Sequence, residues 1–124
     1  MSRSIGNLIE TGNDRNRREL ARDGSSTIAR VVNGRETLYK LASRNYRQEI
    51  APYVRGQDWN EGMIVAQGNK LRHFVNGKLI NETVDENPVG ARVGILALEV
   101  TGSPGTIDFK DLRLRQLGPA NPSR

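Results

Sequence analysis

Three glutamates have the residue type and the surroundings for acid–base chemistry. Glu10, Glu61 and Glu99 each lie in or beside a short apolar run. A carboxyl group in such a place has either a partner or a raised pKa, whereas a glutamate at a strand edge that faces water needs neither. General acid–base catalysis uses pairs of carboxyl groups, one protonated and one ionised, so these residues are candidates for that chemistry.

Four other side chains could contact a ligand, and each has a structural alternative. His73 is the only histidine and alternates with apolar residues, so it is either a partly buried, hydrogen-bonded residue or an acid–base group. Trp59 either packs at the start of a strand or presents its indole face to a sugar ring. Arg17 and Arg18 are either a solvated loop pair or donors to ligand oxygens.

The second half of the chain alternates β-favouring runs with turn signals. Gly68-Asn69 and Asn76-Gly77 separate three such runs, which predicts an antiparallel meander with two-residue turns over residues 60–84. Further strands are predicted at residues 92–100 and 106–117. The second of them contains a break in the alternation at Lys110-Asp111, which predicts a β-bulge.

The first half gives weaker signals. Residues 25–32 predict a strand closed by Asn33-Gly34, and residues 4–10 predict a shorter one. Residues 36–56 mix helical and loop signals, with Pro52 limiting any helix to the segment before it. About seven strands and no heptads or repeats predict an all-β, antiparallel sandwich or jelly roll.

Composition limits the core and the partners. Only 35% of the residues are hydrophobic and the mean hydropathy is -0.61, so the core is thin. The chain lacks cysteine, which excludes disulfides, thiolate metal sites and a cysteine nucleophile. Its first residues show neither a signal peptide nor a membrane span, and compartment stays open.

The excess positive charge lies in the N-terminal half. Residues 1–57 hold 11 Lys and Arg against 6 Asp and Glu, whereas residues 58–124 hold 8 of each. The arginines alternate with acidic residues, and aromatic residues make up only 5% of the chain. This pattern favours a solvated surface, so we expect no specific nucleic-acid partner and at most weak, salt-sensitive binding.

A specific run of motifs extends over residues 58–117, and a looser one precedes it. The matching residues are Trp59, Asn60, Glu61, Gly68, Asn69, His73, Asn76, Gly77, Gly94, Ala97, Leu98, Phe109, Leu112, Arg113 and Leu114, with Gly6, Glu10, Arg17 and Arg18 upstream. In order and spacing this run resembles the C-terminal half of the 3-keto-disaccharide hydrolase domain family. The resemblance implies a concanavalin-like jelly roll that acts on a glycosidic bond next to a 3-keto sugar.

The resemblance also implies roles for the candidate residues. Glu10 and His73 are the expected catalytic residues, and Arg17, Arg18, Glu99 and Trp59 are expected to bind an oxidised disaccharide or glucoside. Glu99 stands where the family commonly has Gln, and Thr101 where it commonly has His, which counts against catalysis. A carbohydrate-binding sandwich without turnover is therefore the alternative. The cofactor is left open, with a divalent metal ion as the candidate.

The family domain is longer than this chain. The resemblance therefore implies that residues 1–117 are the C-terminal part of the domain, incomplete at its N-terminus, and that residues 118–124 are a disordered tail. The missing strands would leave apolar sheet surface uncovered, which predicts self-association or a structural fragment that needs a partner. For a full-length relative the resemblance implies a periplasmic or extracellular location.

Overall fold

The computed structural model describes residues 8–11, 17–22, 24–98 and 105–119 of the chain. Within these residues strands predominate, and helical turns occur between the fourth and fifth strands. In chain order the elements are β1 (Leu8–Thr11), β2 (Arg17–Ala21), β3 (Ser25–Val32), β4 (Arg35–Ser43), the π-helical turn η1 (Tyr46–Ile50), the 3₁₀ turn η2 (Ala51–Tyr53), β5 (Gly62–Gln67), β6 (Lys70–Val75) and β7 (Lys78–Asp85).

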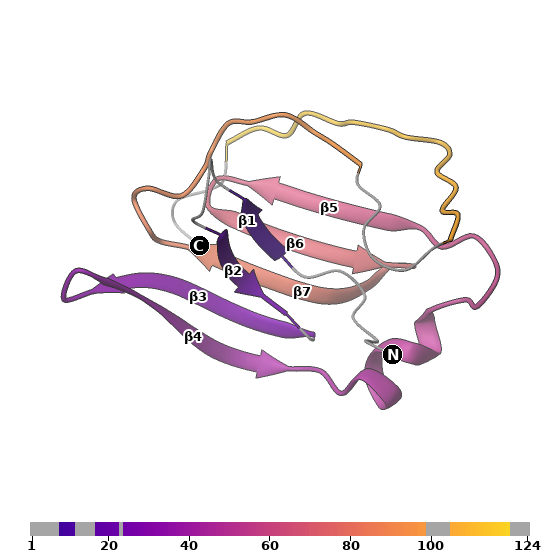
Figure 1. Ribbon diagram of the computed structural model, residues 1–124, viewed down its shortest axis with the longest axis horizontal. Helices are drawn as coiled ribbons and strands as arrows, with labels where there is room; N and C mark the ends of the chain where they lie inside the picture. Colours follow the sequence, from indigo (N-terminus) through magenta and orange to yellow (C-terminus); the bar gives the residue numbers. More distant parts are fainter. Residues whose placement is uncertain (1–7, 12–16, 23, 99–104, 120–124) are drawn as a thin grey trace.

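Two sheets make up the fold, and the smaller one lies over the larger. The large sheet has the strand order β4-β3-β7-β6-β5, and β1 and β2 form a separate two-stranded sheet. In Figure 1 this pair lies in front of the large sheet. Leu8 and Leu20 of the pair pack against Ala29 of β3. The arrangement confirms the predicted all-β sandwich.

Tight turns fix the register of the large sheet. Asn33-Gly34 has φ values of 51° and 74°, and Asn76-Gly77 has φ values of 48° and 78°. Two consecutive positive φ values define the type I′ hairpin turn, which Asn-Gly adopts with little strain. Gly68 also has a positive φ, at 60°. The strands β5, β6 and β7 pair antiparallel through these turns, which confirms the predicted meander over residues 60–84.

Replacement of Gly77 by valine is expected to lower the free energy of unfolding by about 1 to 3 kcal/mol, because a β-branched residue fits poorly at positive φ. No atom lies within 4 Å of a Cβ placed on Gly77, so the cost comes from the backbone alone. Gly62→Val is the matched control, since Gly62 also has open space but no positive φ. Chemical denaturation measures both variants, and an unchanged midpoint for Gly77→Val would contradict the turn assignment.

One pair of neighbouring strands, β3 and β7, runs parallel. Ser26 pairs with Glu82 and Ala29 pairs with Asp85 at the two ends of this ladder. After β4 the chain passes through η1 and η2 to β5, at the opposite edge of the sheet. The antiparallel strands β5, β6 and β7 then lead back to the centre, where β7 lies beside β3 and runs in the same direction. Asp85, the last residue of β7, therefore lies beside β3 on the face that the β1–β2 pair covers.

Three predictions for the first half of the chain were wrong. Residues 35–43 form a strand instead of helix or loop, because the Asn33-Gly34 turn pairs them with β3 and this pairing outweighs local helix propensity. Arg17 and Arg18, which were treated as a loop pair, lie in β2 (Arg17–Ala21), which pairs with β1. The helical structure also passes through Pro52, which occupies the first turn of η2.

The two predicted C-terminal strands are also corrected. Residues 92–98 and 105–119 are apolar in part, yet neither segment is assigned to a strand. An apolar run becomes a strand only when a neighbouring sheet edge accepts its backbone hydrogen bonds, and neither segment has such a ladder. The expected bulge is therefore absent from this region, although Asp111 has a positive φ of 54°. Residues 99 and 100 lie outside the described part.

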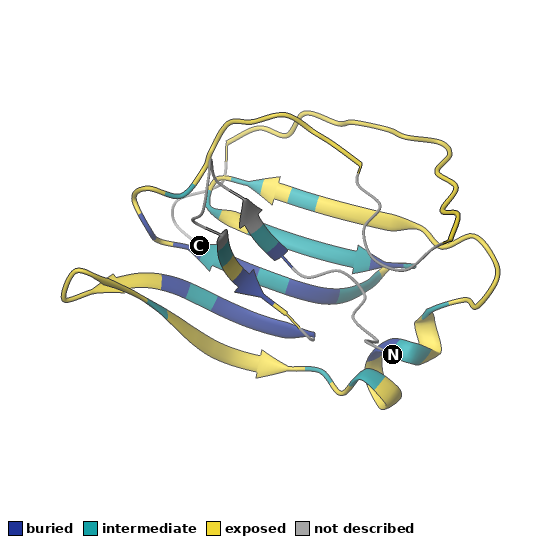
Figure 2. Ribbon diagram, in the orientation of Figure 1, coloured by how far each residue is buried: buried dark blue, intermediate teal, exposed yellow. Residues whose placement is uncertain are grey.

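The core is small and divided by polar contacts. One apolar cluster lies under the β1–β2 pair, and the other joins Ile50 of η1 to Val75 and Ile80. Between them the buried Thr27 hydroxyl lies 2.9 Å from that of Thr83. Figure 2 shows buried residues concentrated on β3 and β7, whereas β4 and β5 are mostly exposed.

Apolar side chains of the C-terminal segments face solvent within the described residues. Ile95 is 92% exposed and Phe109 is 47% exposed. In the strands of the large sheet, Ile64 of β5 is exposed, whereas Leu71 of β6 is partly buried and Val75 of β6 is buried. Self-association through such surface stays a prediction.

Candidate functional site

Five polar residues from three parts of the chain meet where β7 ends. Arg18 comes from β2 and Glu36 from the start of β4, whereas Asp85 ends β7 and is followed by Asn87 and Arg92. Hydrogen bonds and ion pairs connect these residues. We call them the Arg18–Asp85 cluster.

Asp85 is the centre of the cluster. Its side chain is only 3% exposed. Arg18 donates to both of its carboxylate oxygens, from Nη2 to Oδ1 at 2.8 Å and from Nη1 to Oδ2 at 3.1 Å. The backbone N–H of Asn87 donates to Oδ1 at 3.1 Å, and Arg92 Nη1 lies 3.5 Å from Oδ2. Two arginines and one amide therefore compensate a buried negative charge.

Glu36 and the loop after β7 complete the network. Arg18 Nε donates to Glu36 Oε1 at 2.8 Å, and Asn87 Nδ2 donates to the same oxygen at 2.8 Å. Arg92 Nη2 donates to the carbonyl oxygens of Asp85, at 3.0 Å, and of Asn87, at 3.4 Å. The loop after β7 is folded locally by Asn87, whose Oδ1 accepts from the N–H of Val89 at 3.1 Å.

These contacts keep both carboxyl groups ionised. For Asp85, burial raises the pKa, but the Arg18 hydrogen bonds, the Asn87 N–H and the charges of both arginines together hold the pKa below its ordinary value. The Arg18 hydrogen bonds likewise lower the pKa of Glu36, against the opposing effect of burial. The pKa of Arg18 is raised by its hydrogen bonds to Asp85 and Glu36. Neither carboxylate is therefore suited to take a proton near neutral pH.

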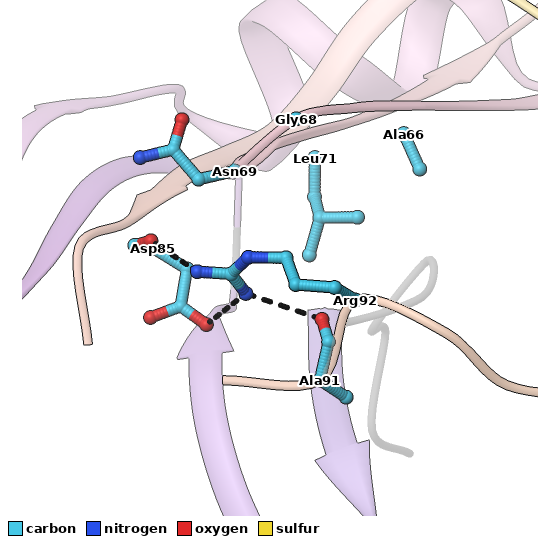
Figure 3. Close-up of a pocket in the computed structure, with 7 residues that line it drawn as sticks. All are labelled: Ala66, Gly68, Asn69, Leu71, Asp85, Ala91 and Arg92. Atoms are coloured by element: carbon cyan, nitrogen blue, oxygen red, sulfur yellow. Dashed lines mark hydrogen bonds and ion pairs between the residues drawn. The ribbon is translucent and has the colours of Figure 1, made fainter. Parts of the chain in front are cut away.

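A small cleft of about 150 Å³ opens next to the cluster. In Figure 3 the Arg92 guanidinium lies between Asp85 and Ala91, while Leu71 and Ala66 lie on its other side. The cleft thus combines an apolar wall with a guanidinium that is held by Asp85 and by backbone carbonyls. Its volume is below the 300 to 1,000 Å³ of common ligand pockets, so it fits part of a small ligand. The lining residues are Ala66, Gly68, Asn69, Leu71, Asp85, Ala91 and Arg92.

Gly90 lets the loop pass close to the cluster. A Cβ at this position would collide with Asp85 Oδ2, and it would lie 2.6 Å from Arg92 Nη1 and 3.0 Å from Asp85 Cγ. The hydrogen bonds described above hold these atoms in place, so a movement that makes room for the Cβ would weaken those bonds.

Replacement of Gly90 by alanine is therefore expected to destabilise the fold by about 1 to 3 kcal/mol through overpacking. Urea denaturation measures the change. Gly94→Ala is the control, because a Cβ on Gly94 meets nothing within 4 Å. Equal midpoints for the two variants would show that the loop does not press on the Asp85–Arg92 pair.

The structure places the expected N-terminal residues next to this cluster. Glu10 of β1 pairs with Arg18 of β2, and Arg17 is the first residue of β2. The side chains of Glu10 and Arg17 lie outside the described part of the structure. Only Arg18, among the three, is seen to enter the cluster.

The other expected site residues are not gathered there. His73 pairs with Asn81, four residues before Asp85 on β7, so it lies about 13 Å along the sheet from the cluster. It is half-buried on the face of Leu71. Trp59 lies in the loop before β5 and is 45% exposed. Glu99 lies outside the described residues.

Four residues of the cluster were not found by sequence reasoning. Asp85 and Asn87 were treated as residues that end one strand, Arg92 as the first residue of the strand predicted at residues 92–100, and Glu36 as part of a helical or loop segment. A signal existed at Asp85 and Asn87, because Asp and Asn spaced by one residue at the end of a strand favour local turn hydrogen bonds. The convergence of Arg18 and Arg92 on Asp85 depends on tertiary structure.

The described residues contain neither a candidate metal site nor a helix that could cross a membrane. Among the described residues, no group of three or more His, Cys, Asp or Glu side chains is placed to hold a metal ion. In the same part of the chain, none of the helices has the length and apolar character needed to cross a membrane.

The comparison with protein families decides the affiliation. The model of the 3-keto-alpha-glucoside-1,2-lyase-like domain matches residues 7–115, most of the 124-residue chain. The chain belongs to this family. Membership in the 3-keto-alpha-glucoside-1,2-lyase-like family confirms the resemblance found in the sequence, and the matched span contains every residue of the Arg18–Asp85 cluster. Neither a curated protein nor a solved structure matches the chain.

Proposed function

We propose that this chain binds 3-keto-glucosides at the cleft beside Arg92 and breaks their glycosidic bond by elimination across C1 and C2. The observation that carries this proposal is the family match over residues 7–115, since the matching domain is described as 3-keto-alpha-glucoside-1,2-lyase-like. The Arg18–Asp85 cluster supports it, because it fixes a guanidinium at the edge of a cleft within the matched span.

The chemistry follows from the ketone. A carbonyl at C3 acidifies the hydrogen on C2, and a base that removes this proton leaves the electron pair in an enolate on the C3 oxygen. The enolate then expels the C1 substituent, so the C1–O bond breaks, a C1=C2 double bond forms and the leaving alcohol takes a proton. Addition of water to the double bond gives the free 3-keto sugar. The protein must supply a base and a group that stabilises the enolate oxygen.

Arg92 is the proposed partner of the keto oxygen. Its guanidinium lines the cleft, and its Nη2 is held by two backbone carbonyls. Such a fixed donor stabilises a developing oxyanion more than a mobile one, because no reorganisation is needed during the reaction. The apolar wall of Leu71 and Ala66 suits the C–H face of a sugar ring.

Glu10 is the proposed base. Its position on β1, opposite Arg18 on β2, supports this choice. Asp85 and Glu36 are unsuitable, because arginine hydrogen bonds lower their pKa values. His73, about 13 Å along the sheet, has no part in this step of the proposal.

Binding without turnover is the second candidate function. Among the described residues, three carboxyl groups have a pKa that departs from its ordinary value, and the direction of these shifts favours binding alone. All three, Glu36, Asp85 and Glu86, have lowered pKa values, whereas a general base is usually tuned upward. The loss of the family's commoner histidine at Thr101 points the same way.

Incubation of the purified chain with a 3-keto-disaccharide distinguishes the two functions. Elimination is expected to release the leaving sugar together with an unsaturated ketone, which absorbs in the ultraviolet. Calorimetry on the same sample reports binding. Saturable binding without either product would establish the second function, and the absence of both binding and product would overturn the proposal.

A further inference from the structure

A loop at the other end of β5 and β6 is held by an unusually complete set of hydrogen bonds. Asn76, in the β6–β7 turn, donates from Nδ2 to the carbonyl of Tyr53 at 2.6 Å and to Asn60 Oδ1 at 2.8 Å. Its Oδ1 accepts from the N–H of Glu61 at 2.8 Å, and its own N–H donates to the carbonyl of Glu61 at 2.9 Å. Asn76 therefore fastens both ends of the loop to the hairpin.

Asn60 closes the loop from inside. Its Oδ1 accepts from the N–H of Arg55 at 2.8 Å, and its Nδ2 donates to the carbonyls of Arg55 at 2.8 Å and Asp58 at 3.2 Å. Asp58 Oδ1 in turn accepts from the N–H of Trp59 at 2.7 Å. We call this set of contacts around the two asparagines the Asn60–Asn76 junction.

The junction presents two exposed aromatic rings. Trp59 is 45% exposed and Tyr53 is 47% exposed, although the backbone of each is hydrogen-bonded within the junction. A lysine ammonium lies over each ring, with Lys110 Nζ at 4.1 Å from the Trp59 centroid and Lys78 Nζ at 5.2 Å from that of Tyr53.

This surface is separate from the cleft. The cleft lies at the Gly68-Asn69 turn, whereas the junction includes Asn76 at the opposite end of β6. The six residues of β6 span about 20 Å. A ligand in the cleft therefore does not touch the junction unless it extends along the sheet.

We propose that Trp59, in the loop fixed by the Asn60–Asn76 junction, forms a second carbohydrate-binding surface that takes the apolar face of a pyranose ring. Aromatic rings offer sugar C–H groups a large, rigid surface, and a loop that is already ordered loses little entropy on binding. The ligand class rests on the proposed function, since the description of the family names a glucoside, but the location rests on the junction alone.

Trp59 is the only tryptophan of the chain, so its fluorescence reports on this surface directly. Maltotetraose and cellotetraose serve as probes, because they are neutral glucans without a keto group. We expect at least one of them to change the Trp59 emission saturably, in the wild type and equally in Arg92→Ala. No saturable change with either glucan would overturn the proposal.

Calorimetry with the glucan that changes the Trp59 emission then tests which residues contribute to its binding. Trp59→Ala and Asn60→Ala are each expected to weaken binding about tenfold, one by removing the ring and the other by releasing the loop. Tyr39→Ala removes an exposed aromatic ring on β4 that has no such junction, and it should leave the affinity unchanged. Wild-type affinity in Trp59→Ala would refute the surface. A wild-type chain that binds the glucan but does not cleave a 3-keto-glucoside would instead count against the proposed function and leave this surface standing.

Discussion

Replacement of Asp85 by alanine is expected to lower the free energy of unfolding by about 3 kcal/mol, as measured by urea denaturation. Removal of one partner of a buried ion pair costs about 3 to 5 kcal/mol, because the remaining charge is left without compensation. Arg18, whose side chain is 13% exposed, would lose two hydrogen bonds, and Arg92 would lose its nearest carboxylate. The lower end of the range applies, since Arg92 is 42% exposed and water can solvate its charge where it lies.

Glu86→Ala is the matched control for this variant. Glu86 is the next residue in the chain and also pairs with an arginine, Arg30, but both side chains are well exposed. Exposed pairs contribute little because water screens them. Equal stability of the Asp85 and Glu86 variants would contradict the account of a buried, compensated carboxylate.

The same contacts predict how stability depends on pH. Asp85 and Glu36 have lowered pKa values in the folded state, so the unfolded chain takes up their protons first as the solution is acidified. Their stabilising effect is complete above the unfolded pKa of about 4 and is lost as the pH falls through the lower folded values. Asp85→Ala should therefore show a flatter loss of stability in acid than the wild type.

Replacement of Arg92 by alanine is expected to reduce kcat/KM for 3-keto-glucoside cleavage about 100-fold. Removal of one fixed donor from an oxyanion site commonly costs two to three orders of magnitude in rate, because the donor acts mainly in the transition state. The fall should therefore lie in kcat more than in KM. Steady-state kinetics with release of the leaving sugar measure both parameters.

Two further variants separate this effect from a change in folding. Arg92→Lys keeps the charge but loses the planar fork, so it should recover only part of the activity. Arg30→Ala removes an exposed arginine of β3 and should leave kcat/KM unchanged. Wild-type kcat/KM in a folded Arg92→Ala protein would contradict the role of Arg92.

The sequence predicted the turn-defined part of the fold well. Asn76-Gly77 and Gly68-Asn69 carry their own conformational preference, so the strands they join could be placed from local residues. Residues 35–43 were misassigned because their Leu and Lys content suits a helix, and only pairing with β3 makes them a strand. Residues 92–98 show the opposite error, because their apolar run predicted a strand but no neighbouring strand pairs with it.

The candidate site was predicted in part. The family resemblance selected Arg18, which does enter the cluster, and Glu10, whose strand lies beside it. Asp85 could not be selected in the same way, because its role comes from Arg18, 67 residues away in sequence. The position of Trp59 likewise depends on Asn76, which sequence reasoning treated as a turn residue only.

The central claim is that the cleft beside Arg92 promotes removal of the C2 proton of a 3-keto-glucoside. Exchange of that hydrogen for deuterium, followed by NMR of the substrate and products in heavy water, tests this step directly. We predict that the wild-type chain accelerates loss of the C2 hydrogen and releases the leaving sugar, and that Arg92→Ala slows both. Bound substrate that keeps its C2 hydrogen at the uncatalysed rate, with no product, would contradict the account.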